Sequence, residues 1–172
     1  LVLQAQEGHS QEIGESIVKL KDEIEDYEAY YHTGNDFLDI IIRDKMRKAR
    51  EKQIDFQAVI RFDAGSFIES LDISTIFGNA LDNAIEASDK LPESMRLITA
   101  KASRIHDMLV IAVENNALLE LPSDGRTSKK DTFLHGFGIA NIRRSAEKYD
   151  GQCTVKSKDG KFILKVMIPV PV

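Results

Sequence analysis

The order of the predicted helices and strands is the feature that most limits what this chain can fold into. Apolar residues recur with helical spacing in four segments, near residues 10–31, 35–52, 72–90 and 139–149. Alternating apolar and polar residues predict five strands, near residues 54–62, 95–105, 108–115, 151–158 and 161–169. Helices and strands do not alternate strictly along the chain. We therefore expect an α+β fold in which helices cover one face of a mixed sheet.

The size, charge and cysteine content narrow the class of protein. The 172 residues suffice for one domain with a substantial core and a short extension. A net charge of −5 gives no support for a nucleic-acid-binding surface. The single cysteine, Cys153, excludes an internal disulfide and favours a reducing, cytosolic setting. No apolar run approaches the roughly 18–20 residues that span a bilayer. Because the sequence begins with Leu1 rather than Met, we expect it to be a fragment of a longer protein.

Residues 10–31 predict a helix with a narrow apolar seam. Its apolar residues follow the alternating spacings of four and three that define a heptad. They are Ile13, Ile17, Leu20, Ile24, Tyr27 and Tyr31. Such a seam needs a helical partner, either in this chain's own domain or in a second copy. The second copy is favoured, because the segment precedes the compact part and is too short to close a bundle alone. We expect residues 1–34 to be a dimerisation-helix remnant that forms a homodimer through residues 10–31, and residues 35–172 to be a separate domain.

The predicted helix over residues 72–90, for which Asp72 would be the N-cap, carries two asparagines one turn apart. Asn79 and Asn83 fall at the border of its apolar stripe. Asparagine is unfavourable inside helices, so two stacked amides need an explanation. They are either two partly exposed amides or a pair of carboxamide oxygens directed at a cation or polar ligand. Neutral oxygens suit Mg²⁺ when phosphates supply the negative charge.

A glycine motif follows a long polar stretch. Residues 117–134 predict a lid or a solvated loop, because they are polar and long for a connection. Gly136 and Gly138 then precede the predicted helix that starts near residue 139. Two such glycines let backbone amides approach an anion, and the helix N-terminus adds a positive dipole. The strand over 108–115 ends in Asn115, which is either a turn signal or a partner for the amino edge of a purine.

Taken together, these motifs resemble the ATP-binding domain of the GHKL superfamily of gyrases, heat-shock chaperones, histidine kinases and mismatch-repair ATPases. Residues 79–87, Asn-Ala-Leu-Asp-Asn-Ala-Ile-Glu-Ala, are similar to the N box of sensor histidine kinases, and residues 135–142 resemble their G2 box. Thr33-Gly34-Asn35 and Leu38-Asp39 resemble the branch of quorum-sensing and peptide-pheromone receptor kinases. The resemblance covers roughly residues 10–170. It implies a Bergerat-type two-layer α/β sandwich that binds ATP with Mg²⁺.

The resemblance also implies which residues bind the nucleotide. The implied set is Asn79, Asn83, Asn115, Lys129, Lys130, His135, Gly136, Gly138 and Ile139. Asn83 matches the Mg²⁺-coordinating residue, and the glycines match those of the phosphate loop. The two lysines stand where lid residues reach toward the phosphates. Asn115 stands where most of the superfamily has the aspartate that binds the adenine amino group.

Three departures from the family pattern affect this expected site. The amide of Asn115 contacts adenine more weakly than a carboxylate, so a low ATP affinity is expected. Ala117 replaces the first glycine of the motif that follows this position. Glu86 stands where many histidine kinases carry a basic residue near the phosphates. Charge compensation would then depend on Mg²⁺ and the lid.

Position 79 distinguishes the classes of the superfamily. Hydrolytic members and the serine kinases of the superfamily have a glutamate there as general base, whereas Asn79 cannot take a proton. This favours transfer to an imidazole, which is nucleophilic when neutral. The resemblance thus implies the ATP-binding catalytic domain of a two-component sensor histidine kinase, which phosphorylates a histidine and then a response regulator.

None of the chain's four histidines (His9, His32, His106 and His135) lies in the acceptor context of this branch. We expect the acceptor to precede Leu1, so that this fragment contains no catalytic residue and is inactive alone. The expected location is the cytoplasmic part of a membrane-anchored receptor, with membrane contact only through the missing N-terminal sensor. Two alternatives stay open. One is a non-catalytic GHKL-fold dimerisation or binding module that has lost ATP use, and the other is an unrelated α+β domain that binds a small molecule.

Overall fold

The computed structural model describes residues 13–20, 31–117 and 129–172, and only the backbone of residues 129–137. The chain divides into two compact units, Leu1–Tyr31 and His32–Val172. In the first unit, residues 13–20 form a helix with exposed apolar side chains on it. Ile24 and Tyr27 of the predicted seam lie outside the described residues, and Tyr31 is not helical.

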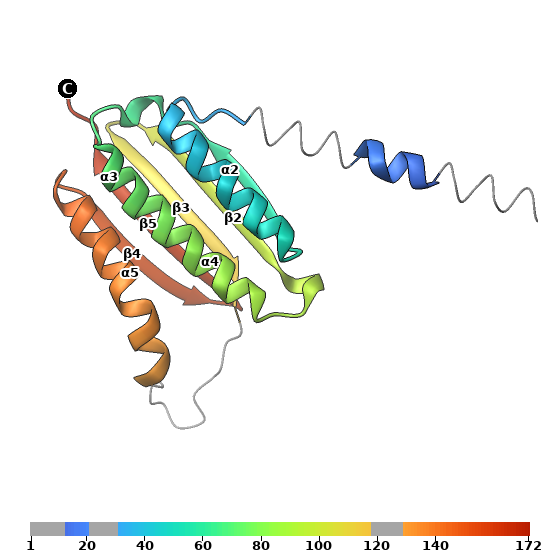
Figure 1. Ribbon diagram of the computed structural model, residues 1–172. Coiled ribbons are helices and arrows are strands. Elements are labelled where there is room, and N and C mark those ends of the chain that lie inside the picture. Colours follow the sequence, from blue (N-terminus) through green and yellow to red (C-terminus); the bar gives the residue numbers. More distant parts are fainter. Residues whose placement is uncertain (1–12, 21–30, 118–128) are drawn as a thin grey trace, which may run out of the picture. The chain divides into compact units, whose positions relative to one another are not determined.

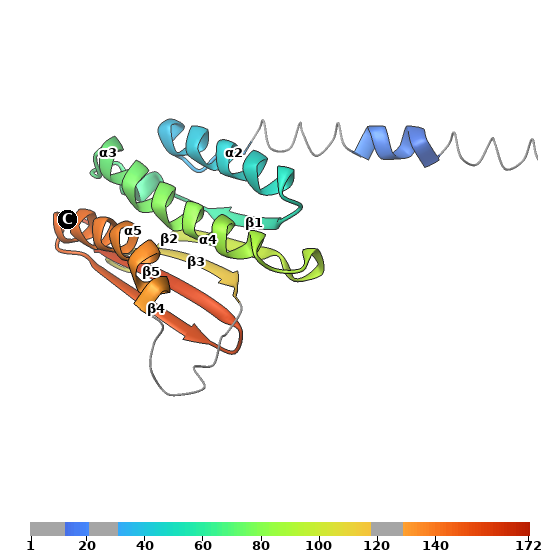
Figure 2. The ribbon, with the colours of Figure 1, turned by 60° about the horizontal axis from the view of Figure 1, so that its bottom comes forward.

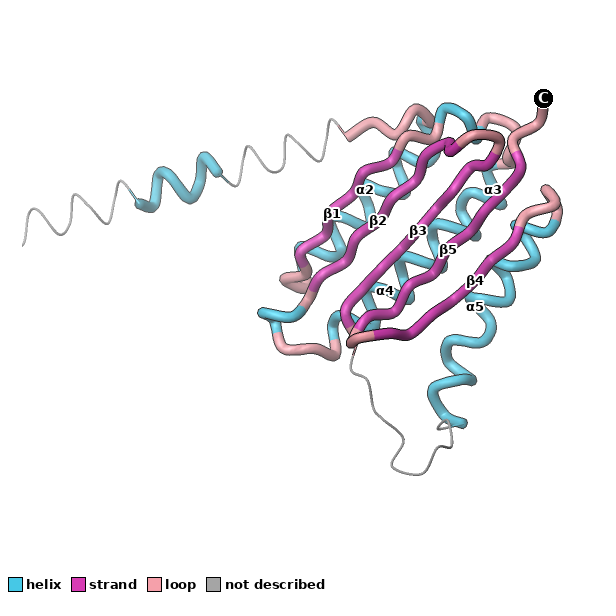
Figure 3. The backbone as a smooth tube through the Cα atoms, turned by 180° about the vertical axis from the view of Figure 1, so that it is seen from behind, coloured by secondary structure: helices cyan, strands magenta, loops and turns pink. Residues whose placement is uncertain are grey.

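The second unit contains a five-stranded mixed sheet in the order β1-β2-β3-β5-β4 (Figures 1 and 3). The strands are β1 (Asp55–Ile60), β2 (Leu97–Ile105), β3 (Met108–Asn116), β4 (Gln152–Lys158) and β5 (Lys161–Pro169). β1 pairs with β2 in parallel, and the other three pairings are antiparallel. The α+β class and the mixed sheet predicted from the sequence are therefore confirmed.

Helices cover one face of this sheet (Figure 2). They are α2 (Asp36–Glu51), α3 (Ser70–Ile73), α4 (Asn79–Asp89) and α5 (Lys129–Glu147). A π-helical turn, Ser74–Gly78, joins α3 to α4, so that the two form one continuous helical segment. Short 3₁₀ turns at Asp63–Gly65 and Glu93–Met95 complete the connections.

The core lies between the sheet and the helices. Along β3, residues Leu109, Ile111 and Val113 alternate toward the helical layer and are almost fully buried. On the other side, the π-helical turn contributes Phe77, whose ring meets that of Phe62 edge-to-face at a centroid distance of 5.4 Å. This packing fixes the helical segment α3–α4 against the sheet.

The loop before α2 is tied to the domain by a buried carboxylate. Asp39 accepts hydrogen bonds from the backbone N–H of Thr33 (2.7 Å) and from its hydroxyl (2.6 Å), and it also contacts His32 Nδ1 (3.1 Å). The side chain of Asn35 caps α2 by accepting from Leu38 N at 2.9 Å. The Thr-Gly-Asn and Leu-Asp motifs thus share one structural role, which is to fix the start of α2.

The prediction that Asp72 is an N-cap is wrong. The N-cap position belongs to Glu69, and the helix begins at Ser70. Asp72 lies inside the first turn, is 1% exposed and pairs with Lys148 of the last part of the domain. An aspartate suits either position at a helix start, because both favour negative charge. Its partner is 76 residues away, so local sequence does not reveal the difference.

The prediction that the last helix begins near residue 139 is also wrong. α5 begins at Lys129, so Gly136 and Gly138 lie within a helix rather than in a loop ahead of one. Residues 129–147 contain no proline, and a glycine inside a helix costs only about 1 kcal/mol. Part of the expected lid over 117–134 is therefore helical, and the rest of it, residues 118–128, lies outside the described residues.

The strands predicted over residues 151–158 and 161–169 are confirmed as β4 and β5, which form a hairpin. Asp159 and Gly160 adopt positive φ angles of 53° and 72°, as a two-residue turn between twisted strands requires.

No helix within the described ranges is both long and apolar enough to cross a membrane.

Candidate functional site

Three of the predicted site residues meet where α4 and α5 pack together. A Cβ atom at Gly138 of α5 would lie 3.3 Å from Asn83 Nδ2, 3.5 Å from its Oδ1 and 3.8 Å from the Cβ of Asn79. A side chain at position 138 would therefore press on the amide of Asn83, which the glycine avoids. The prediction that the N-box asparagines and this glycine belong to one site therefore has a geometric basis.

The side-chain amide of Asn83 has an unusual environment. Its Nδ2 atom is buried, and no residue in the described part of the chain accepts a hydrogen bond from it. A buried polar group without a partner costs about 1–3 kcal/mol, and native proteins contain few of them. Such an amide is consistent with a group held ready for a ligand.

The amide of Asn79 is held in one orientation. Its Nδ2 donates to the carbonyl oxygen of Thr75 at 2.8 Å, one turn earlier in the helical segment. This bond leaves the carbonyl oxygen Oδ1 as the atom that can meet a ligand or cation. The π-helical turn that contains Thr75 ends immediately before Asn79. π turns are rare and often mark functional sites.

Asn115 lies on the face of β3 that the helices cover and is 2% exposed. Its Nδ2 donates to the carbonyl oxygen of the next residue, Asn116, at 2.8 Å. β3 contacts α4, so Asn115 lies between the sheet and the helix that carries the two N-box asparagines. Its Oδ1 atom is the one that would accept from an amino group.

The carboxylates of the N-box helix are balanced by lysines. Asp82, next to Asn83, forms an ion pair of 2.5 Å with Lys45 of α2, whose side chain is only 9% exposed. Glu86 pairs with Lys90 at 3.7 Å. Because the lysines offset their charge, the carboxylates of Asp82 and Glu86 repel an anionic ligand less than unpaired carboxylates would.

The remaining predicted residues all belong to α5. Lys129 and Lys130 are its first two residues, and the glycine motif follows within the same helix. Of Lys129, Lys130, His135 and Gly136, the structure describes only the backbone. Ile139 is half-buried beside Gly138.

Two contributors to the site had no clear sequence signal. Thr75 orients Asn79 through its backbone carbonyl, which any residue provides. Asp72 anchors α5 from a distant position in the chain. The only local hint was Gly78, a helix-breaking residue inside a helical pattern, which stands at the end of the π turn.

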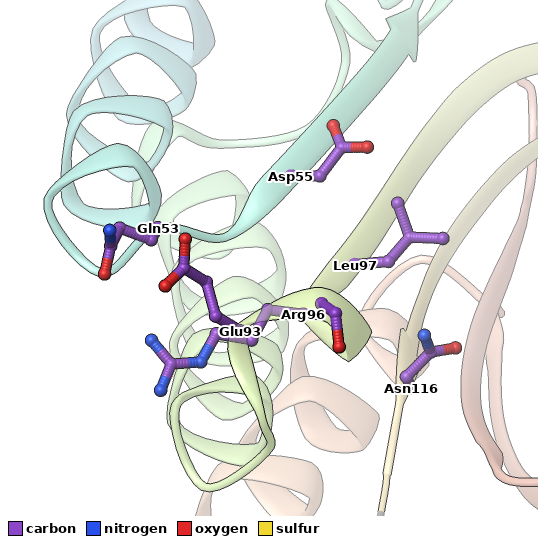
Figure 4. A pocket seen from close by; sticks show the side chains of 7 residues that line it. Gln53, Asp55, Glu93, Arg96, Leu97 and Asn116 are labelled. Carbon is purple, nitrogen blue, oxygen red and sulfur yellow. The ribbon is translucent and has the colours of Figure 1, made fainter.

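A separate open pocket of about 710 Å³ lies at the start of β1 and β2 (Figure 4). Its lining is Gln53, Asp55, Glu93, Ser94, Arg96, Leu97 and Asn116. The Arg96 guanidinium donates to the backbone carbonyls of Leu91, Lys52 and Asp89 at 2.9, 2.7 and 3.2 Å, so its donors hold loops together. None of the predicted site residues lines this pocket.

Comparisons with solved structures agree with this architecture. The chain is similar to the Acinetobacter baumannii histidine kinase AdeS, with 12% identity and a TM-score of 0.55 over 79% of this chain and 64% of that one. It is also similar to the catalytic domain of histidine kinase ThkA in two nucleotide-free forms. These show 17% and 18% identity and TM-scores of 0.57, over 81% of this chain and 93% of theirs. At these identities the likeness shows a shared fold.

Sequence comparison identifies the family. No curated protein matches the chain significantly. The family model described as the GHKL domain matches residues 68–169, which is more than half of the chain and includes α3, α4 and all strands except β1. The chain therefore belongs to the GHKL domain family.

Proposed function

We propose that this chain is the ATP-binding catalytic domain of a sensor histidine kinase, which transfers the γ-phosphoryl group of ATP to a histidine. The observation that carries the proposal is the buried Nδ2 atom of Asn83 beside Gly138, which has no acceptor in the described part of the chain. Within a GHKL domain, an amide prepared in this way is best explained as a nucleotide ligand. The GHKL fold and the histidine-kinase-like architecture support this assignment.

The residues present fit a magnesium nucleotide. The buried Nδ2 atom of Asn83 has no acceptor among the described residues, which a phosphate oxygen would supply, and the oriented Asn79 keeps a carbonyl oxygen available. Neutral amide oxygens are suitable Mg²⁺ ligands when a polyphosphate supplies the charge. We propose that Asn83 and Asn79 hold the cation side of the nucleotide, and that Asn115 meets the amino edge of adenine.

The start of α5 is suited to the phosphates. The sequence places Lys129 and Lys130 at the first two positions of this helix. A helix N-terminus carries a partial positive charge, and lysines there are unfavourable unless an anion is bound. We propose that the polyphosphate neutralises this end of α5, with His135, Gly136, Gly138 and Ile139 on the helical turns that follow.

The mechanism then consists of positioning and charge neutralisation. When bound, Mg²⁺ supplies charge neutralisation at the β- and γ-phosphates. The chain's own residues bind the nucleotide, orient the γ-phosphate and exclude water around it. Because Asn79 offers no general base, water is not activated, and a neutral imidazole is the nucleophile that needs no base.

The partners of this reaction are part of the proposal. The acceptor histidine and the response regulator lie outside this chain, and the helix within residues 10–31 joins two copies. Membrane anchoring and membership of the quorum-sensing branch are proposed from the sequence motifs alone. A non-catalytic GHKL module is the second candidate, favoured by one observation: Asn115 already bonds to the backbone of its own strand.

Calorimetric titration with a non-hydrolysable ATP analogue tests the proposal, with and without Mg²⁺. Wild-type protein should bind only weakly without Mg²⁺, and Asn83→Ala should remove the Mg²⁺-dependent gain. Gln57→Ala, which removes an exposed amide on β1, is the matched control and should bind like wild type. Absence of nucleotide binding by the wild-type protein would favour the non-catalytic module.

A further inference from the structure

Asp72 is a buried carboxylate that the proposed chemistry does not use. It is 1% exposed. Lys148 Nζ lies 2.9 Å from one carboxylate oxygen, and Tyr149 donates its hydroxyl to the other at 2.8 Å. Ser145 adds a third side-chain hydrogen bond. The Tyr149 oxygen in turn accepts from the backbone N–H of Glu69 at 3.0 Å.

All three partners belong to the C-terminal end of α5 or the two residues that follow it. α5 runs antiparallel to the segment α3–α4, because Ser145 and Lys148 meet Asp72 while Gly138 meets Asn83 (Figure 2). α5 contacts α3, the π-helical turn and α4 in succession. The two helices are therefore joined at one end by a polar cluster and meet at the other end in the candidate nucleotide site.

The hydrogen bonds of Asp72 fix the position of α5 relative to α3, in addition to holding the two helices together. A buried ion pair is weak evidence for stability, since apolar replacements often stabilise a fold equally well. Hydrogen bonds, in contrast, restrict distance and angle. Three donors around one carboxylate define the register and direction of α5 more narrowly than an apolar contact, which tolerates sliding.

The register of α5 matters because its contact with Asp72 lies close to its contact with Asn83. Gly138 and Ser145 are seven residues apart, which is about 10 Å along a helix. A Cβ added at Gly138 would stand 3.3 Å from Asn83 Nδ2, so the free space between the two residues is less than a methyl group needs. A small tilt or rotation of α5 at Asp72 therefore changes the space beside the Asn83 amide.

We propose that Asp72 is a positioning residue for nucleotide binding: it holds the C-terminal end of α5 so that Gly138 stays against Asn83. This inference rests on the proposed function for its consequence, which is the nucleotide affinity. Its structural part, the control of α5 by Asp72, is measurable without any nucleotide.

The test compares Asp72→Asn with Asp39→Asn. Both replace a buried, multiply hydrogen-bonded aspartate by its near-isosteric amide. Asp39, however, holds the start of α2, and its described partners are Thr33, His32 and Arg43 rather than residues of α5. Tyr149→Phe is an intermediate variant, because it removes one donor and keeps the ring that packs edge-to-face on Phe67. Two quantities are measured at a temperature where all variants are folded. They are amide exchange of residues 138–147 without nucleotide and the affinity for an ATP analogue with Mg²⁺.

Asp72→Asn should speed amide exchange in residues 138–147 and weaken nucleotide binding by about tenfold or more. Tyr149→Phe should weaken nucleotide binding by a smaller factor, and Asp39→Asn should weaken it less than twofold. If Asp72→Asn leaves exchange in α5 unchanged, or if both aspartate variants speed it equally, the positioning role is overturned. If wild type binds no nucleotide, the proposed function fails, while the exchange comparison still decides whether Asp72 controls α5. If exchange changes but affinity for the analogue does not, Asp72 holds α5 without positioning the site, and the proposal is overturned.

Discussion

Gly138 of α5 lies directly against the amide of Asn83 of α4, where an added Cβ would stand 3.3 Å from Nδ2 and 3.5 Å from Oδ1. This relationship connects two sequence motifs that are 55 residues apart. It also limits the space beside Asn83 Nδ2, a buried nitrogen for which the described residues provide no hydrogen-bond acceptor.

Gly138→Ala should reduce nucleotide affinity without unfolding the domain. Alanine is favoured over glycine inside a helix by about 1 kcal/mol, which offsets the strain of the added methyl group. The methyl group presses on the Asn83 amide, so we expect roughly a tenfold loss of affinity. Gly78→Ala is the matched control, because no described residue outside its own helical turn lies within 4 Å of a Cβ there. Titration calorimetry and thermal unfolding of both variants check this, and equal affinities in the two would contradict it.

Asn83→Ala should abolish Mg²⁺-dependent nucleotide binding and leave the ligand-free domain at least as stable as wild type. The Nδ2 atom of Asn83 is buried and has no acceptor among residues whose side chains are described, a state that costs about 1–3 kcal/mol, and alanine removes it. Active-site residues often show this opposition of stability and function. Urea unfolding and calorimetry measure the two effects. A clear loss of stability with unchanged affinity would mean that Asn83 is a structural residue.

Stability should fall in acid through the two buried aspartates. Burial raises the pKa of Asp72, but hydrogen bonds from Lys148, Tyr149 and Ser145 outweigh it and hold the pKa below its usual range. The same balance, with Thr33 as the main donor, lowers the pKa of Asp39.

A lowered folded-state pKa stabilises the fold above the unfolded value of about 3.9, and this contribution is lost as the pH falls through the folded-state pKa. The free energy of unfolding should therefore be level from about pH 7 to 5 and decline below about pH 4. Asp72→Asn should show a shallower decline. Asp107→Asn, which removes an exposed carboxylate in a turn, should decline like wild type. Identical slopes for all three proteins would contradict the assignment.

The exposed apolar residues of the first unit should mediate self-association. Ile13, Ile17 and Leu20 are 59%, 61% and 59% exposed on the helix over residues 13–20. Burying one such side chain stabilises an interface by about 1.5–3 kcal/mol. We expect a weak homodimer that dissociates at micromolar concentrations, and a folded monomer when Ile17 and Leu20 are both replaced by Glu. Sedimentation analysis checks the mass. If this double variant unfolds the domain, the helix packs on its own chain instead.

The sequence predicted those elements whose determinants are local. The five strands follow from the alternation of apolar and polar residues within each segment, and the structure confirms all five. The position of Asp72 depends on a contact with a distant segment, and it was predicted wrongly. The start of α5 was also predicted wrongly, because the two glycines were taken to precede the helix.

The candidate site follows the same division. The periodicity of α4 suggested that Asn79 and Asn83 share a face, and that is how they meet Gly138. The π-helical turn that precedes Asn79 was not predicted, because its extra residue is absorbed by tertiary packing of Ile76 and Phe77. The polar cluster at Asp72 was missed because no motif relates it to Ser145, Lys148 and Tyr149.

The most direct test of the account is an NMR titration of the isotope-labelled chain with an ATP analogue, with and without Mg²⁺. We predict that the largest chemical-shift changes occur at the backbone amide of Gly138 and at the side-chain amides of Asn79, Asn83 and Asn115. The change at Asn83 should require Mg²⁺. Shifts confined to Gln53, Arg96 and Asn116 would place the ligand in the other pocket, and no shifts at all would mean that this GHKL domain does not bind ATP.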